Sequence, residues 1–157
     1  HRKPGAVGAG LISDAYTEII CDGFHIHPAA LRIAFAMLGE DNSIIISDSM
    51  RAAGHFDGEY DLGGQTVYVK DGKALLADGT IAASTSNVYE ELKNVINFGI
   101  PVKQAIKSAT INPARSIRAD NETGSIKEGK NADLLVVDRD MNIKLVGVRG
   151  EVKVNNL

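Results

Sequence analysis

The sequence has only one cysteine, Cys21, among its 157 residues. This excludes an intrachain disulfide framework and favours a reducing, cytoplasmic compartment. Aromatic residues make up only 5% of the chain whereas glycine occurs 16 times, which is typical of a loop-rich α/β enzyme. No apolar run approaches the roughly 20 residues that a membrane-spanning helix needs, so we expect no membrane partner.

An excess of one charge sign is also missing. The 17 Lys and Arg residues and the 20 Asp and Glu residues give a net charge of −3, and no basic patch is visible. We therefore expect no nucleic-acid partner. The hydrophobic fraction of 44% excludes wholesale disorder. The chain begins at His1 with no initiator Met, inside a loop-like segment, and we expect it to be a fragment of a longer protein.

Apolar patterns predict a strand–helix–strand unit near the N-terminus. The run at 18–21 predicts a buried strand, and the residues from Pro28 to Gly39 predict a helix with Pro28 in its first turn and Gly39 at its end. Three consecutive isoleucines at 44–46 predict a second strand. Their continuous rather than alternating pattern is typical of a parallel strand that is covered on both faces.

The rest of the chain alternates between β and α patterns. Glycine-punctuated segments at about 54–80 predict a β-hairpin insertion. Helices are predicted at 86–98, at 102–110 and from 112 onward, and strands at 132–138, 143–148 and 151–154. The fold class is therefore α/β, and two or three parallel strands are too few to close a barrel.

Polar side chains follow the two predicted parallel strands, where functional groups gather in α/β folds. Asp48 comes directly after the second strand, at a place where a partly dry pocket would tune a carboxylate for proton transfer. The alternative is that Asp48 only caps the following turn.

Three histidines and the cysteine allow more than one role. His25 and His27 form a His-x-His pair that binds metal when it lies on a strand, but the flanking Gly23 and Pro28 make strand geometry doubtful. One imidazole bonded to a substrate, or two surface histidines, are the alternatives. His55 fits a solvated loop, and Cys21 fits the core better than a nucleophile.

Six blocks occur in a fixed order: Arg2-Lys3-Pro4-Gly5, Asp22-Gly23-Phe24-His25, Ser47-Asp48-Ser49-Met50, Asp78-Gly79-Thr80-Ile81-Ala82-Ala83-Ser84, Asn112-Pro113-Ala114-Arg115 and the segment from Gly124 to Leu134. Together they resemble the C-terminal half of the N-acetylglucosamine-6-phosphate deacetylases, a family of the amidohydrolase superfamily. The resemblance covers essentially the whole chain. The fifth and sixth blocks are similar to amidohydrolases in general, and the first, second and fourth to the sugar-phosphate deacetylases in particular.

The resemblance implies a fold and a division into domains. Residues 1–120 would be the C-terminal portion of a (β/α)₈ TIM barrel, with its last two strands and helices and the hairpin insertion at about 54–80. Residues 121–157 would be the C-terminal strands of a small β-sandwich domain.

The resemblance also implies the site. Asp48 would be the catalytic general base and acid, His25 would contact the substrate, and Arg2 would bind the sugar phosphate, often across a dimer interface. Ile81, Ala82 and Ala83 would lie in the loop before the helix that follows the hairpin and would line the pocket. Ala83 replaces the glycine that is usual in that loop. The family's metal ligands, a glutamate and two histidines, match no position of this chain.

The implied activity is the metal-dependent hydrolysis of N-acetyl-D-glucosamine 6-phosphate to D-glucosamine 6-phosphate and acetate. The implied cofactor is a divalent metal, zinc or iron, in the full-length protein, and the implied partners are an amino-sugar phosphate and a second copy in a homodimer. A cyclic-amide hydrolase similar to dihydroorotases or hydantoinases is one alternative. A non-catalytic fragment is the other, because this chain alone is expected to be inactive.

Overall fold

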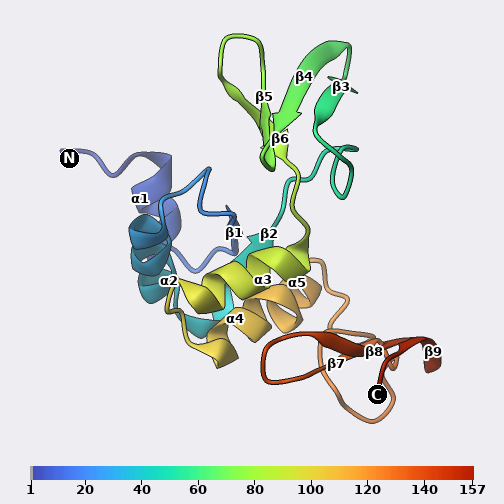
Figure 1. The fold of residues 1–157 in the computed structure, drawn as a ribbon. Helices are drawn as coiled ribbons and strands as arrows, with labels where there is room; N and C mark the ends of the chain where they lie inside the picture. The colour runs from blue at the N-terminus through green and yellow to red at the C-terminus, as the bar shows by residue number, and fades with distance from the viewer. Residues whose placement is uncertain (1) are drawn as a thin grey trace. The chain divides into compact units, whose positions relative to one another are not determined.

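A computed structural model describes residues 2–157, and His1, where we expect the chain to be cut from a longer one, lies outside the described residues. The fold is mixed α/β, as the sequence predicts. The chain divides into two compact units, His1–Ala109 and Thr110–Leu157. Figure 1 labels their elements.

A β–α–β unit follows a short first helix, α1 (Gly5–Ile12). Strand β1 (Thr17–Ile20), helix α2 (Pro28–Asn42) and strand β2 (Ser43–Ile46) follow in order, close to the predicted positions. The two strands pair in parallel, which confirms the prediction from the isoleucine run. The register sets Ile20 opposite Ile46, so both strands reach the same edge of the sheet together.

Helix α2 contains a kink at Gly39, the residue that we expect at its end. Gly39 has a φ of 67°, but helical structure resumes after it and runs to Asn42. A kink frees backbone carbonyls that the helix would otherwise satisfy. The side-chain amide of Gln104 donates to two of them, the carbonyls of Phe35 at 2.8 Å and Gly39 at 2.7 Å.

The core of the first unit lies between the parallel strands and the helices α2, α3 (Val88–Asn97) and α4 (Val102–Ala109). Leu31, Phe35 and Leu38 are buried on one face of α2, as their spacing predicts. On α3, Val95 is buried as expected, but Val88 is 41% exposed, although its spacing places it on the same predicted face. Val88 is the first residue of its helix, where the chain has only begun to turn toward the core.

The glycine-rich insertion is larger than the predicted hairpin. It forms a four-stranded antiparallel sheet of β3 (Gly58–Leu62), β4 (Gln65–Lys70), β5 (Lys73–Leu75) and β6 (Ile81–Ser84). Its own small core includes Val67, Val69 and Ala83, together with Met50 from the segment after β2. The strand β6 differs from the prediction, since the resemblance implies a loop at Ile81–Ala83.

The second unit begins with the short helix α5 (Ile111–Ser116). Strands β7 (Leu134–Val137), β8 (Ile143–Val148) and β9 (Glu151–Asn155) form a three-stranded antiparallel sheet, as the tail predicts. Gly147 is the only residue of these strands that is buried, and every residue of β9 is exposed.

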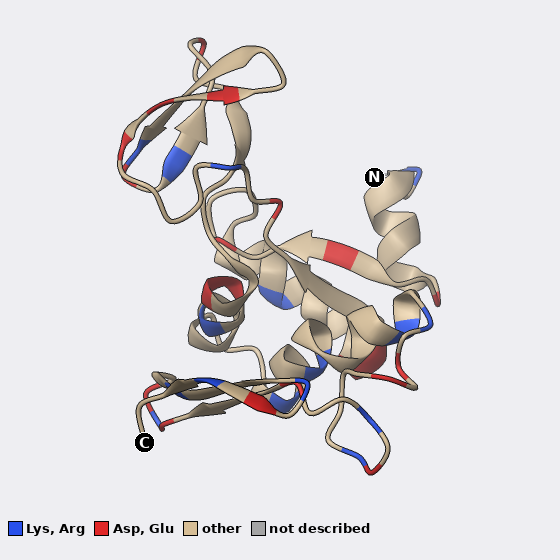
Figure 2. Ribbon diagram, turned by 90° about the vertical axis from the view of Figure 1, so that its right-hand side faces the viewer, with Lys and Arg blue, Asp and Glu red and all other residues tan. Residues whose placement is uncertain are grey.

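Charged residues of both signs are spread along the ribbon (Figure 2). At the end of α2, Glu40 Oε2 lies 2.8 Å from Lys103 Nζ, and Asp41 Oδ1 lies 2.6 Å from Lys107 Nζ on α4. Exposed pairs of this kind add little to stability. Among residues 2–157, no helix is both long and apolar enough to cross a membrane.

Gly124 occupies a position that we expect to tolerate no other residue. Its φ is +81°, and a Cβ there would lie 2.8 Å from Ala114 Cβ and 3.0 Å from the backbone Cα of Ile111. Gly129 has a similar φ of +86° but open space around it. Gly124→Ala should therefore lower the free energy of unfolding by about 1–3 kcal/mol more than Gly129→Ala. Urea unfolding of both variants measures the difference. Equal losses of unfolding free energy would show that the positive φ, and not the contact with Ala114 and Ile111, causes the destabilisation.

Candidate functional site

The carboxyl ends of the two parallel strands define the candidate site. Because Ile20 pairs with Ile46, Asp22 and Asp48 each follow the end of their strand by two residues at the same edge. Asp48 belongs to the segment after β2, and Asp22 and His25 belong to the turn between β1 and α2. The fold thus brings together the two polar junctions that the sequence singles out.

Asp22 and His25 form a tight pair. Asp22 Oδ2 lies 2.7 Å from His25 Nδ1, and both side chains are about one-sixth exposed, at 15% and 17%. Asp22 Oδ1 also accepts the backbone N–H groups of Phe24 and His25, each at 2.8 Å. Partial burial raises the pKa of Asp22, but the hydrogen bonds from His25 and Phe24 outweigh it and hold this pKa below its usual value. The carboxylate therefore fixes the His25 ring.

The turn that carries His25 is also tied to the four-stranded sheet. The ring of Phe24 packs edge-on against His25, with ring centroids 5.9 Å apart. Lys73 Nζ on β5 lies 4.8 Å from the centroid of the Phe24 ring, within the range of a cation–π contact. The position of His25 thus depends on Asp22 on one side and, through Phe24, on Lys73.

The other two histidines have different surroundings. His27 is exposed and caps α2, since its Nδ1 accepts the backbone N–H of Ala29 at 3.2 Å. His25 and His27 therefore do not share a ligand geometry: one ring nitrogen faces Asp22 and the other faces the helix. His55 is exposed beside Tyr60, with ring centroids 6.3 Å apart, as expected of a loop residue.

Asp48 is exposed and has an unusual backbone. Its φ of 50° lies in the left-handed region, which Asp tolerates better than most residues. Its carbonyl accepts the N–H of Ser84 at 3.1 Å, and Met50 N–H donates to the Ser84 carbonyl at 3.0 Å. Asp48 is exposed in this chain, so the partly dry surroundings that we expect around it are not found here.

The backbone pairing with Ser84 brings the β6 strand alongside Asp48. Ile81, Ala82 and Ala83, predicted as pocket residues, lie on this strand. Ala83 is 8% exposed and packs in the core of the four-stranded sheet, while Ile81 is 37% exposed. Arg2 is exposed before α1, and among the described residues it has no hydrogen bond or ion pair with the other predicted site residues.

A buried carboxyl that the sequence did not single out lies near the end of β1. Glu91 on α3 is 0% exposed, and its Oε1 accepts a hydrogen bond from Ser86 Oγ. Burial, opposed by the Ser86 hydrogen bond and reinforced by the charge of Asp22, raises the pKa of Glu91 to about 7. Its sequence signal is helical spacing: Glu91 lies four residues before the buried Val95, on the apolar face of the helix.

Cys21 lies beside the same carboxyl at the end of β1. The thiol is fully buried and donates to the carbonyl of Ile19 at 3.3 Å. Burial, together with the charges of Glu91 and Asp22, raises the pKa of Cys21 well above its ordinary value. A buried thiol held protonated is not a nucleophile at neutral pH, which confirms the prediction of a core residue.

A cavity of about 630 Å³ adjoins this region in the first unit. Its volume falls within the range of about 300–1,000 Å³ that is typical of small-molecule sites. Its lining is mostly polar and includes Asp22, Ser86, His55 and Lys93. Asp48 and His25 are not among the lining residues.

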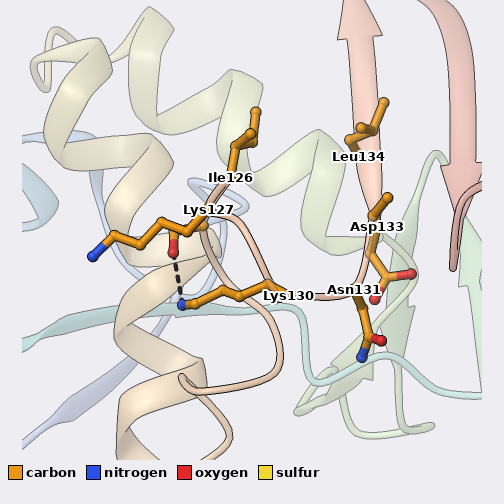
Figure 3. A pocket seen from close by; sticks show the side chains of 8 residues that line it. Ile126, Lys127, Lys130, Asn131, Asp133 and Leu134 are labelled. Carbon is orange, nitrogen blue, oxygen red and sulfur yellow. Dashed lines mark hydrogen bonds between the residues drawn. The ribbon is translucent and has the colours of Figure 1, made fainter.

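A smaller pocket of about 90 Å³ lies in the second unit (Figure 3). Lys130 Nζ donates to Ser125 Oγ at 2.7 Å and to the carbonyls of Thr123, at 3.1 Å, and Asp120. The lysine therefore ties the loop before β7 together, and none of the predicted site residues lines this pocket.

The divalent metal that the resemblance implies was tested against the side chains present. Within the part of the chain that the structure describes, no three His, Cys, Asp or Glu residues are placed to hold one ion. His27 is used as a helix cap and His25 faces a carboxylate. These residues do not form a metal site by themselves.

Comparisons with known proteins identify the family of this chain. Residues 7–153 match the Amidohydrolase family. A putative N-acetylgalactosamine-6-phosphate deacetylase of Escherichia coli K12 is 36% identical over 97% of this chain and 92% of its own length. The N-acetylglucosamine-6-phosphate deacetylase of Bacillus subtilis is 40% identical over 97% of this chain but only 39% of its own length.

Solved structures show the same likeness. The N-acetylglucosamine-6-phosphate deacetylase of Thermotoga maritima superposes with a TM-score of 0.91 at 36% identity, covering 97% of this chain and 42% of that one. A mutant of the Mycobacterium smegmatis enzyme, in complex with N-acetyl-D-glucosamine-6-phosphate, gives a TM-score of 0.92 at 32% identity, covering 99% and 42%.

The chain belongs to the amidohydrolase family, since the family match spans nearly all of it. Within that family, the relatives just described are named as deacetylases of phosphorylated amino sugars. The chain spans about two-fifths of the length of the Bacillus relative and nearly all of the E. coli one.

Proposed function

We propose that this chain is the C-terminal part of a deacetylase that hydrolyses N-acetyl-D-glucosamine 6-phosphate to D-glucosamine 6-phosphate and acetate. The observation that carries the proposal is the register of β1 and β2, which places Asp48 and the Asp22–His25 pair at one edge of the sheet. The names of the relatives supply the chemical class of the substrate.

In this mechanism, water attacks the acetamide carbonyl and Asp48 accepts a proton from it. The C–N bond then breaks, Asp48 returns the proton to the departing amine, and acetate and the free amino sugar leave. A single carboxylate can do both, because it is a base when ionised and an acid once it has accepted the proton of the attacking water. His25, held by Asp22, contacts the substrate through its other ring nitrogen, and Ile81, Ala82 and Ala83 lie on the strand beside Asp48 and border the substrate in the full-length protein.

The remaining parts of the site come from outside this chain. The divalent metal, zinc or iron, is held by residues that this chain does not contain. In the full-length protein, β1 and β2 are the last two strands of a (β/α)₈ barrel, residues 1–120 complete the barrel with the inserted sheet, and β7–β9 belong to a small β-sandwich. The exposed faces of β7–β9 support the last assignment, because such faces require a partner layer.

Arg2 binds the phosphate of the substrate, with the site completed across a homodimer. Arg2→Ala should reduce kcat/KM for the 6-phosphate substrate by about 10–100-fold, since a charge-assisted hydrogen bond contributes about 1.5–3 kcal/mol. The same substitution should affect unphosphorylated N-acetylglucosamine far less. Steady-state kinetics on both sugars measures the ratio, and Lys3→Ala is the neighbouring control. Equal losses on both sugars would refute phosphate recognition.

A substrate panel tests the proposed function. The full-length protein, loaded with zinc or iron, is assayed against acetamidosugar phosphates, cyclic ureides and dihydroorotate. We expect turnover of the first class only. Preference for ring amides would identify a cyclic-amide hydrolase instead. The purified 157-residue chain with added metal should be inactive, and activity would show that it contains its own metal ligands.

A further inference from the structure

We propose that Glu91 is a positioning residue: through Ser86 it holds the segment that carries Asp48, and through its charge state it acts on the Asp22–His25 pair. This inference rests on the proposed function for its kinetic consequence. Its structural basis is a hydrogen-bonded path that runs from the segment after β2 to the buried Glu91 carboxyl.

The path consists of serine hydroxyls and backbone groups. The backbone N–H of Ser84 donates a hydrogen bond to the carbonyl of Asp48 at 3.1 Å. Ser84 Oγ lies 2.7 Å from Ser86 Oγ and accepts the Ser86 N–H at 3.0 Å. Ser86 Oγ donates to Glu91, and the Ser86 carbonyl accepts a hydrogen bond from Ser49 Oγ, next to Asp48. Displacement of the Glu91 carboxyl therefore changes the geometry at Asp48.

The buried end of the path is incomplete. Glu91 Oε2 has no hydrogen bond of standard geometry among the described residues, although the side chain is fully buried, and a weaker interaction with the Cys21 backbone favours the charged form. A buried carboxylate oxygen without a partner is costly, whereas a protonated carboxyl removes the charge that burial penalises. The protonated form is therefore the one that this site accommodates best.

Three titratable groups surround this carboxyl. Cys21 and Asp22 lie at the end of β1, and His25 lies in the turn that follows it. The negative charge of Asp22 opposes ionisation of Glu91, whereas His25 favours it. Loss of the Glu91 proton places a second negative charge beside the Asp22–His25 pair. In the protonated form this second charge is absent, and His25 keeps its contact with Asp22.

The first test observes Glu91 directly in the 157-residue chain. Carbon-detected NMR of the glutamate carboxyls should show Glu91 titrating near pH 7, and the amide signals of Asp48 and His25 should follow the same midpoint. Ser86→Ala should move that midpoint upward, because the Ser86 hydrogen bond favours the charged form. A Glu91 midpoint near the ordinary value of 4.5, or amide signals at Asp48 and His25 that do not follow the Glu91 midpoint, would overturn the proposal.

The second test uses the full-length protein. The ratio of kcat/KM for Glu91→Gln to that of wild type should rise about threefold or more between about pH 6 and pH 8.5, because Gln mimics only the neutral carboxyl. A purely structural role would give a constant ratio. The exposed Glu59→Gln is the control, for which the ratio should stay near one at every pH.

The outcomes separate the two proposals. If wild type hydrolyses no acetamidosugar phosphate, the proposed function fails, while the NMR titration still decides whether Glu91 acts on Asp48 and His25. If turnover is found but the kinetic ratio is flat, the proposed function stands and the role of Glu91 is refuted. Should Glu91→Gln fail to fold, the wild-type titration and Ser86→Ala decide the matter.

Discussion

Asp48→Asn should reduce deacetylation by the full-length protein by about 10²–10⁴-fold, the usual contribution of a general acid–base group. The amide keeps the shape of the side chain but cannot accept the proton of the attacking water. Asn is also the right replacement for the backbone, because the φ of 50° at this residue is tolerated by Asn and strained for Ala. The loss should appear in kcat, since chemistry rather than substrate binding is affected.

Asp71→Asn is the matched control for this experiment. Asp71 is exposed, has a φ of 51° and lies in the turn between β4 and β5. It should leave turnover, metal content and the unfolding midpoint unchanged. For Asp48→Asn the metal content and the midpoint should also stay near the wild-type values. Retained turnover in that variant would remove Asp48 from the mechanism.

The second large effect concerns the pH dependence of stability. The folded chain raises the pKa of Glu91 from 4.5 to about 7, so between these values the folded state holds a proton that the unfolded state has lost. The free energy of unfolding should therefore fall as the pH rises from 4.5 to 7, by about 3 kcal/mol from this one group. Glu91→Gln should abolish this component of the slope.

Urea unfolding of wild type and Glu91→Gln at several pH values measures the difference. Groups that titrate alike in wild type and variant cancel in the comparison. The pKa of Asp22 is lowered by folding, so Asp22 makes stability depend on pH only below its ordinary pKa of 3.8. Glu59→Gln, on the exposed strand β3, should follow the wild-type curve. Parallel curves for wild type and Glu91→Gln across this window would show that folding does not raise the pKa of the buried carboxyl.

The β–α–β unit could be predicted because its signals are local. A continuous isoleucine run, Pro28 at a helix start and apolar spacing along α2 each identify an element without knowledge of its neighbours. Parallel pairing followed from the same pattern and is confirmed by the register. The edge at which Asp48 and His25 meet follows directly from that pairing.

The missed features depend on contacts distant in sequence. Ile81–Ser84 forms a strand because β5 and the segment after β2 supply its backbone partners, and no local pattern shows those partners. Glu91 becomes unusual only because Ser86, Cys21 and Asp22 surround it. The exposure of Asp48 likewise depends on which parts of the protein pack around it. The pairing of His25 with Asp22 is also visible only in the structure, since the sequence left the role of His25 open between metal, substrate and surface.

The bond from the Gln104 amide to the carbonyls of Phe35 and Gly39 has an evolutionary consequence. A straight helix at position 39 would leave the glutamine without its acceptors. A shorter side chain at 104 would remove its hydrogen bonds from both carbonyls, and the Gly39 carbonyl would keep only the longer bond from Ser43 Oγ at 3.4 Å. Relatives should therefore exchange these two residues together rather than singly. A collection of homologous sequences in which either position drifts while the other stays constant would contradict that linkage.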